Sequence, residues 1–223
     1  MRTEASLFSA REAHMTESVE LWSSDPWFRV GAPDLTDLRT FHATGCRITG
    51  AELLLYVEAD LQLRDNGVVL FEEPRFEVAA LAQALTAWVG DGAEPDHDFE
   101  HSPDAYEEPG VVRIARSGEG WVAGSCFAAT TTSPHTWETV KDFVGAFVTE
   151  IHRCTARSLL DVGWSIMEAM AALCRGFGLP LAHSRTIVLE TSGQEREFWA
   201  FQEQVWDVLE ALADDVQPGK EIP

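Results

Sequence analysis

Residues 52–73, with the sequence ELLLYVEADLQLRDNGVVLFEE, decide the fold that we expect for this chain. From Leu53 to Leu63 apolar residues alternate with mainly polar ones, which is the period-2 pattern of a strand with one buried face. Asn66 and Gly67 supply the two residues of positive φ that a type I′ turn requires. The strand is therefore expected to fold back through residues 68–72 as a β-hairpin.

A helix, a second hairpin and a second helix are expected to follow. Residues 78–89 place apolar side chains on one helical face, and Gly90 is expected to end that helix. Residues 111–129, VVRIARSGEGWVAGSCFAA, predict a hairpin with its turn at residues 117–120. Ser133 and Pro134 predict the N-cap and first residue of a helix. The predicted class is α+β, with an antiparallel sheet built from two β-hairpins and helices packed on one face.

Two further regions flank this α+β core, which we place at residues 45–155. Residues 1–44 show little periodicity but contain several aromatic residues, so we expect an N-terminal arm docked on the core. Residues 156–223 are expected to form a mainly helical C-terminal extension: a helix over 158–180, a short strand at 185–191, and a final helix opened by the capping box Ser192-x-x-Glu195. Phe198 and Trp199 lie next to each other on that last helix, which indicates a homodimer contact as an alternative to packing within the chain.

Charge is the strongest global feature of the sequence. Asp and Glu number 37 against 16 Lys and Arg, giving a formal net charge of -21 at pH 7. Such a surface repels nucleic acid and attracts basic partners, although it also serves solubility. No segment is apolar enough for a signal peptide or a membrane span, and the four cysteines form no C-x-x-C pair. We therefore expect a cytoplasmic protein with reduced thiols, which binds neither nucleic acid nor membranes.

Two motifs share an aromatic residue, two glutamates and a proline: FEEP at residues 71–74 and YEEP at 106–109. Proline cannot donate to a sheet ladder, so both motifs are typical of strand margins. Adjacent glutamates point to opposite faces of a strand, which disfavours an acid and base pair within one motif. A role of these glutamates in partner binding is the alternative that we retain.

Signatures of catalysis and cofactor binding are weak. In DHDFEH, at residues 96–101, His97 and His101 could contribute two metal ligands, but a third ligand at a recognisable spacing is missing. His152 lies near Cys154 without an organised anion-binding loop, and Ser125 falls inside a predicted strand, outside a G-x-S-x-G motif. The chain contains neither a G-x-x-x-x-G-K-[ST] nor a G-x-G-x-x-G motif. We therefore predict no cofactor and no metal.

The first strand, both EEP motifs, the G-W-x-x-G-S strand at residues 120–125 and the helix after it resemble a small uncharacterised domain of actinomycete proteins. The resemblance covers about residues 46–152. Some proteins with this domain look like toxin-immunity proteins. The resemblance implies an α+β fold and transfers no catalytic residue.

The leading hypothesis is a non-enzymatic acidic binding protein of immunity or antitoxin type that caps a basic protein partner such as a toxin. Residues 91–110 form an acidic stretch without Lys or Arg, and they motivate this choice together with the net charge. The alternatives are a metal-dependent hydrolase that uses His97 and His101, and an oligomeric scaffold built through the final helix. The predicted partner-binding residues are Glu72, Glu73, Asp98, Glu100, Glu107 and Glu108.

Overall fold

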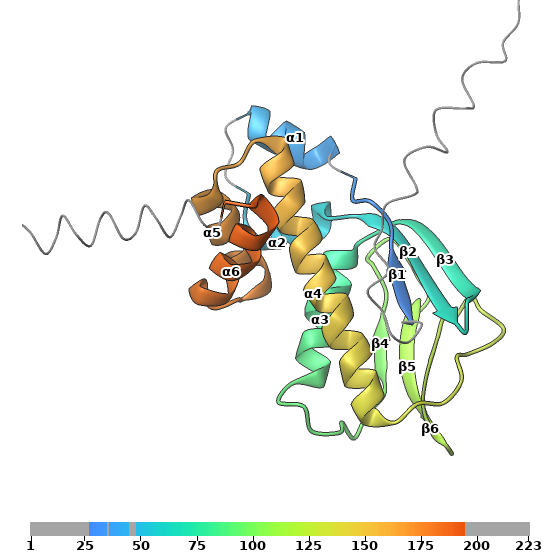
Figure 1. Cartoon of the computed structure of the whole chain (residues 1–223). Helices are drawn as coiled ribbons and strands as arrows, with labels where there is room; N and C mark the ends of the chain where they lie inside the picture. The colour runs from blue at the N-terminus through green and yellow to red at the C-terminus, as the bar shows by residue number, and fades with distance from the viewer. Residues whose placement is uncertain (1–26, 35, 45–47, 195–223) are drawn as a thin grey trace, which may run out of the picture.

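The computed structural model describes residues 27–34, 36–44 and 48–194, which form two three-stranded antiparallel sheets and six helices (Figure 1). The α+β class and the helical C-terminal part are confirmed. The elements in chain order are β1 (Phe28–Val30), α1 (Thr36–Ala43), α2 (Gly50–Tyr56), β2 (Ala59–Asp65), β3 (Val68–Phe76), α3 (Val78–Val89), β4 (Phe99–His101), β5 (Val112–Ser117), β6 (Gly120–Gly124), α4 (Trp137–Val162), α5 (Ile166–Phe177) and α6 (Leu181–Ser192).

The first hairpin is confirmed, but its first strand begins later than predicted. Asn66 and Gly67 have φ angles of 46° and 82° and connect β2 to β3. Residues 53–56, predicted as the start of the strand, belong to the helix α2 instead. The reason is local, because Thr49 and Glu52 form a capping box: the Thr49 hydroxyl accepts the Glu52 N–H and the Glu52 carboxylate accepts the Thr49 N–H.

The two hairpins lie in separate sheets and not in the one sheet predicted, because each pairs with a third strand of its own. The first sheet has the order β1-β2-β3, and the second, which contains the confirmed hairpin of β5 and β6, has the order β4-β5-β6. β3 is an edge strand with two register shifts, and Arg75 has a φ of 53° at the second of them. Pro74 therefore lies in a bulge of an edge strand, where the missing N–H costs no ladder bond.

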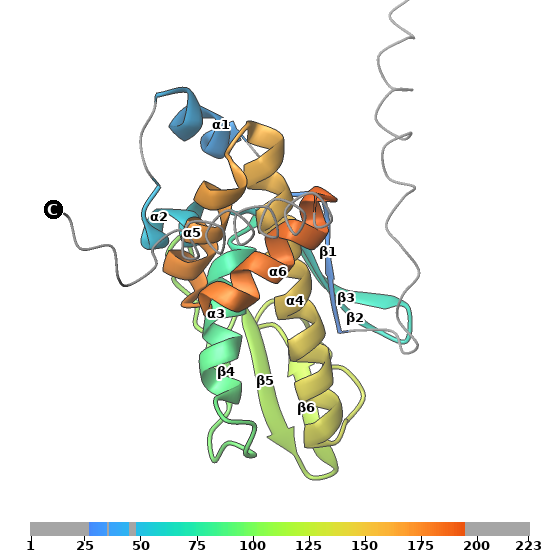
Figure 2. The ribbon, with the colours of Figure 1, turned by 60° about the vertical axis from the view of Figure 1, so that its left-hand side comes forward.

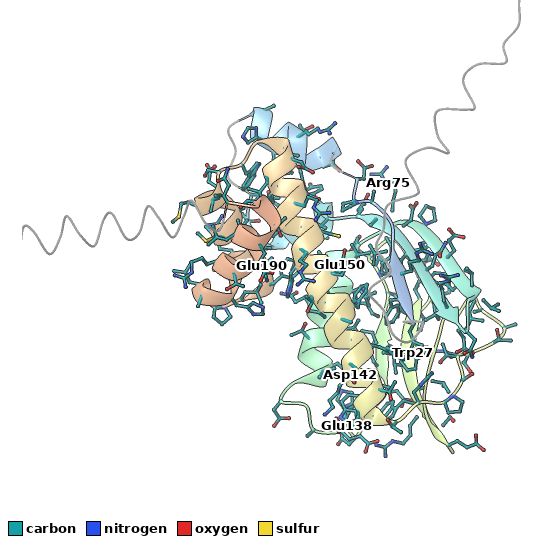
Figure 3. The ribbon with its side chains drawn as sticks, viewed as in Figure 1. Trp27, Arg75, Glu138, Asp142, Glu150 and Glu190 are labelled. Carbon is teal, nitrogen blue, oxygen red and sulfur yellow. The ribbon has the colours of Figure 1, made fainter. Side chains whose placement is uncertain are left out.

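Helices α3 and α4 lie side by side and cover the same face of the sheets (Figure 2). α3 matches its predicted range and ends at Gly90. α4 begins at Trp137, after the N-cap Thr136, and not at Pro134 as predicted. Trp27 is 1% exposed between the sheets and α4, where its ring lies 5.3 Å from that of Phe143 (Figure 3). Burial of such aromatic rings joins sheets and helices in one hydrophobic core.

The C-terminal part differs from the prediction in two ways. The helix predicted over 158–180 is interrupted, because Gly163 adopts a φ of 106° and ends α4 before α5 begins. The predicted strand at 185–191 is wrong, since these residues belong to α6, where Ile187 and Val188 are buried. The final helix predicted from Ser192, with its dimer contact, lies outside the described residues.

The division of the chain at residues 44/45 and 155/156 stays a prediction. α4 runs through Thr155 without interruption, and α5 packs against α2 of the preceding region. Gly176 makes that packing close, because a Cβ atom there would lie 2.6 Å from Cδ2 of Leu53. Among the described residues no helix is long and apolar enough to span a membrane.

Candidate functional site

The fold brings the two EEP motifs together through their aromatic residues. Glu73 pairs with Leu61 across β2 and β3, so its side chain leaves the sheet on the same face as that buried leucine. Burial raises the pKa of Tyr106 to about 12, and the nearby Glu73 carboxylate, as an acceptor for the hydroxyl and as a negative charge, adds to this shift. The contact therefore links the first motif to the second.

An exposed phenylalanine completes this cluster. The ring of Phe127 lies 5.8 Å from that of Tyr106 and 6.5 Å from that of Phe71, to which it is nearly parallel. Phe71 is buried, whereas Phe127 is 51% exposed. A ring that is backed by two others yet open on its outer side is a common anchor for a binding partner. We call Glu73, Tyr106, Phe127, Glu107 and Glu108 the Phe127 face.

A tight turn after β6 presents Phe127. The buried Ser125 hydroxyl accepts the Phe127 N–H, and the Ser125 carbonyl accepts the Ala128 N–H. The Cys126 N–H donates to the carbonyl of Gly110, which ties this turn to the loop that carries the second motif. Ser125 lies just after β6, not inside a strand as predicted, and its hydroxyl serves the turn.

The six predicted partner-binding acids do not converge on one point. Glu72 pairs with Gln62 on the opposite face of β3 from Glu73, and the Gln62 amide donates to its carboxylate at 2.9 Å. The Asp98 carboxylate accepts the Arg116 N–H at 3.0 Å. Adjacent glutamates thus point to opposite faces, as predicted for a strand.

The other three predicted acids are exposed. Glu100 lies on β4 opposite Arg113 and close to Gly110. Glu107 and Glu108 lie in the loop before β5, and the Glu108 carbonyl accepts the Ser102 hydroxyl. Of the ion pairs in the described part of the chain, none involves Glu73, Glu107 or Glu108.

Three tryptophans hold residues 91–98, the first part of the acidic stretch, against the core. Trp88 donates its indole N–H to the carbonyl of His97, and Trp137 donates to that of Gly92. Trp121 donates to Oε1 of Glu94 at 2.9 Å. The three rings contact one another at 5.2 to 5.5 Å between centroids. This first part of the acidic stretch is therefore fixed in place by buried aromatic donors.

The partly exposed side chain of Arg116 contacts both Trp121 and Glu94. Its Nη2 atom lies 2.8 Å from Oε1 of Glu94, and its guanidinium carbon lies 5.0 Å from the centre of the Trp121 ring. We call these three residues the Arg116 clamp. One carboxylate thus receives an aromatic N–H and a stacked guanidinium together.

The histidines considered as metal ligands do not lie together with a third ligand. His97 is exposed and pairs with Asp96 at 2.9 Å, whereas the His101 ring lies parallel to Phe99 and its pKa is lowered by burial. In residues 27–34, 36–44 and 48–194, no group of three or more His, Cys, Asp or Glu residues is placed to hold a metal ion. No observation in this part of the chain favours the metal-dependent alternative.

The pair of His152 and Cys154 on α4 lacks the properties of an activated thiol. Burial, followed by the charge of Glu150, raises the pKa of Cys154 to about 12. Burial, followed by the nearby His183, lowers the pKa of His152 to about 4. A nucleophilic cysteine needs a lowered thiol pKa, so this geometry favours the neutral thiol.

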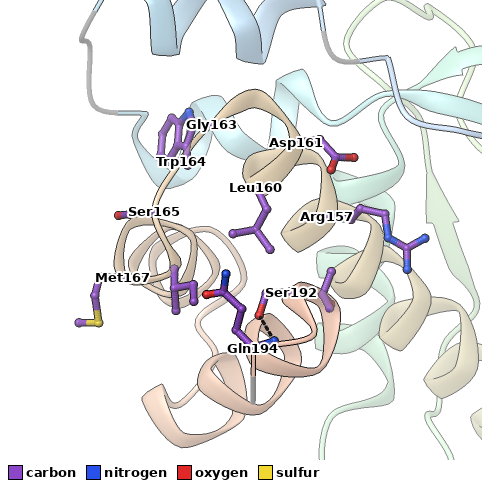
Figure 4. A pocket seen from close by; sticks show the side chains of 11 residues that line it. Arg157, Leu160, Asp161, Gly163, Trp164, Ser165, Met167, Ser192 and Gln194 are labelled. Carbon is purple, nitrogen blue, oxygen red and sulfur yellow. Dashed lines mark hydrogen bonds between the residues drawn. The ribbon is translucent and has the colours of Figure 1, made fainter. Parts of the chain in front are cut away.

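A pocket of about 700 Å³ opens where the end of α4, the start of α5 and the end of α6 meet (Figure 4). Arg157 and Asp161 contribute charges, and Leu160 and Trp164 contribute apolar surface. Its last lining residue, Gln194, is also the last residue that the structure describes. None of the predicted site residues lines this pocket.

Two residues of the Phe127 face were not identified from the sequence. Tyr106 stands directly before the second pair of glutamates, so the motif itself was the available signal. Phe127 was assigned to a strand, and the serine two residues before it was the signal for a turn.

Comparison with known proteins identifies the family and nothing beyond it. No curated protein and no solved structure gives a significant match. A family model described as "Domain of unknown function (DUF7878)" matches residues 40–155, from α1 to the middle of α4. This match covers just over half of the 223 residues and agrees with the range of the resemblance to an uncharacterised domain. The chain therefore belongs to the DUF7878 family, whose function is unknown.

Proposed function

We propose that this protein is a non-enzymatic binding protein of immunity or antitoxin type, which caps a basic protein partner in the cytoplasm. The observation that carries the proposal is the Phe127 face. It combines a 51% exposed aromatic ring with three glutamates that form no ion pair within the described residues. The resemblance of the core to actinomycete domains, some of them immunity-like, supports the same proposal.

The arrangement fits what binding surfaces need. An aromatic anchor at the centre contributes most of the affinity, and charged groups around it set the on-rate and the choice of partner. Glu107 and Glu108 are exposed and directly follow Tyr106, whose ring contacts Phe127. The net charge of -21 would raise the association rate with a basic protein at low salt. It would also disfavour nucleic acid as the partner.

The structure changes the composition of the predicted site. Glu73, Glu107 and Glu108 stay in it, whereas Glu72 faces the other side of β3 and Asp98 binds the backbone of Arg116. Glu100 lies beside Gly110, at the margin of the predicted binding site. Tyr106 and Phe127 join the site because they contact the first motif.

Capture of partners from a native lysate tests the proposal. The full chain serves as bait after nuclease treatment, and bound proteins are eluted with rising salt and identified by mass spectrometry. We expect one basic protein that is released late, because contacts that exclude water are screened less than exposed charges. A mixture of basic proteins released early would mean that the charge serves solubility, and it would refute the proposal.

A further inference from the structure

The Arg116 clamp shows how this chain binds a guanidinium at its surface. Three parts are combined: a ring under the guanidinium, a carboxylate beside it, and an aromatic donor that holds the carboxylate. The Arg116 side chain is 55% exposed and that of Glu94 is 48% exposed, so the arrangement forms at the boundary with solvent. Both Trp121 and Arg116 donate to the same oxygen of Glu94.

The Phe127 face contains the same parts without the arginine. Glu73 lies two residues from Phe71 on the same face of β3. Tyr106 supplies an aromatic hydroxyl near its carboxylate, where Trp121 supplies an indole N–H to Glu94. Phe127 packs against Tyr106 and against Phe71 beneath it, and half of its surface stays open. None of the ion pairs in the described ranges involves Glu73.

We infer that the Phe127 face binds an arginine side chain of the basic partner, with the guanidinium stacked on Phe127 and paired with the Glu73 carboxylate. This inference rests on the proposed function and names the chemistry of its site. Both features of the face point to one occupant, because a guanidinium is planar, stacks on aromatic rings and presents a fork of donors to a carboxylate. Glu107 and Glu108, which follow Tyr106 in the chain, supply further exposed negative charge.

Other occupants would use only part of the face. A lysine ammonium would pair with Glu73, but it is a compact and strongly hydrated charge that stacks less well. An aliphatic side chain would pack on Phe127 and leave the carboxylate without a charged partner. Preference for arginine over lysine at equal peptide charge is therefore the property that distinguishes this proposal.

The test compares hexa-arginine with hexa-lysine as probes of the full-length protein. Their affinities are measured by calorimetry at about 150 mM salt, where long-range charge effects are screened. Because the two peptides carry the same charge, the general attraction to an acidic protein is the same for both and does not affect their comparison. We expect hexa-arginine to bind about 2- to 5-fold more tightly, as one stacked cation at an exposed ring would give.

Substitution of Phe127 then tests whether the preference for hexa-arginine arises at this ring. Phe127→Ala should abolish the preference and leave hexa-lysine binding nearly unchanged. Met167→Ala is the matched control, because Met167 is a 64% exposed apolar residue on α5 and outside the Phe127 face. The preference should persist in that variant.

The outcomes separate this inference from the proposed function. Equal binding of the two peptides, binding of neither, or a preference for arginine that survives Phe127→Ala would overturn the arginine site. A basic partner captured from lysate would leave the proposed function standing in each of these cases. Absence of such a partner would refute the proposed function, whatever the peptides do.

Discussion

Glu94→Ala is predicted to destabilise the fold by about 2 kcal/mol, because the substitution removes the acceptor of a buried donor. Trp121 is 2% exposed, and its indole N–H would lose its only hydrogen-bond acceptor among the described residues. A buried donor without a partner costs about 1–3 kcal/mol. The ion pair with Arg116 adds only about 0.2–1 kcal/mol, since both side chains are about half exposed. For a chain of this size, 2 kcal/mol corresponds to a fall in Tm of about 4–8 °C.

Thermal and urea unfolding followed by far-UV circular dichroism measure this effect. Glu107→Ala is the matched control: it also removes one exposed carboxylate, and it should change stability by no more than about 0.5 kcal/mol. In a Trp121→Phe background the Glu94→Ala substitution should cost about 1 kcal/mol less, because the indole donor is already absent. If Glu94→Ala lowers the free energy of unfolding equally in both backgrounds, the bond between Trp121 and Glu94 is refuted. The Arg116 clamp would then no longer support the arginine site by comparison.

Three further predictions concern helix packing and the titration of Tyr106. Gly145→Ala on α4 should stabilise the fold by about 0.5–1 kcal/mol in urea unfolding, since no atom lies near the added methyl group. Gly50→Ala should instead destabilise it by about 1–3 kcal/mol, because the methyl group would meet the backbone oxygen of Arg175; equal effects of the two substitutions would contradict the packing of α2 on α5. Tyr106 should ionise near pH 12 in a phenolate absorbance titration, and Glu73→Gln should lower that pKa. The stability that Tyr106 contributes should be complete below about pH 10 and lost as the pH rises through about 12, so an unchanged titration in Glu73→Gln would argue against the link between the motifs.

The parts of the fold that follow from local chemistry could be predicted from the sequence. The hairpin turn at Asn66 and Gly67 is one such part, because both residues accept positive φ at little cost. Residues 53–56 were misassigned because the consecutive Leu53, Leu54 and Leu55 are compatible with a strand and with a helix. The capping box of Thr49 and Glu52 decides for the helix, in which Leu53 is buried and Leu55 is exposed. The β-branched stretch 185–191 forms a helix because burial of its apolar side chains against α4 and α5 outweighs intrinsic strand propensity.

The candidate site was only partly predictable, because it depends on contacts between loops that are distant in the sequence. The acidic residues are visible in the sequence, but Tyr106 and Glu73 become neighbours only when the loops are packed. The exposure of Phe127 likewise depends on the turn at Ser125 and on its bond to Gly110. Sequence patterns predict which face of an element is buried, whereas contacts between distant loops depend on tertiary packing.

The most direct test of the account compares two variants that lose the same charge in different places. One carries Glu73→Gln, Glu107→Gln and Glu108→Gln on the Phe127 face. The other carries Glu119→Gln, Glu138→Gln and Asp142→Asn, which neutralise exposed acids in the β5–β6 turn and on the first turns of α4 (Figure 3). Each is used with the wild type to capture partners from the same lysate. We expect a basic partner to be lost from the first variant and kept by the second, and equal capture by both variants would contradict the binding role of the Phe127 face.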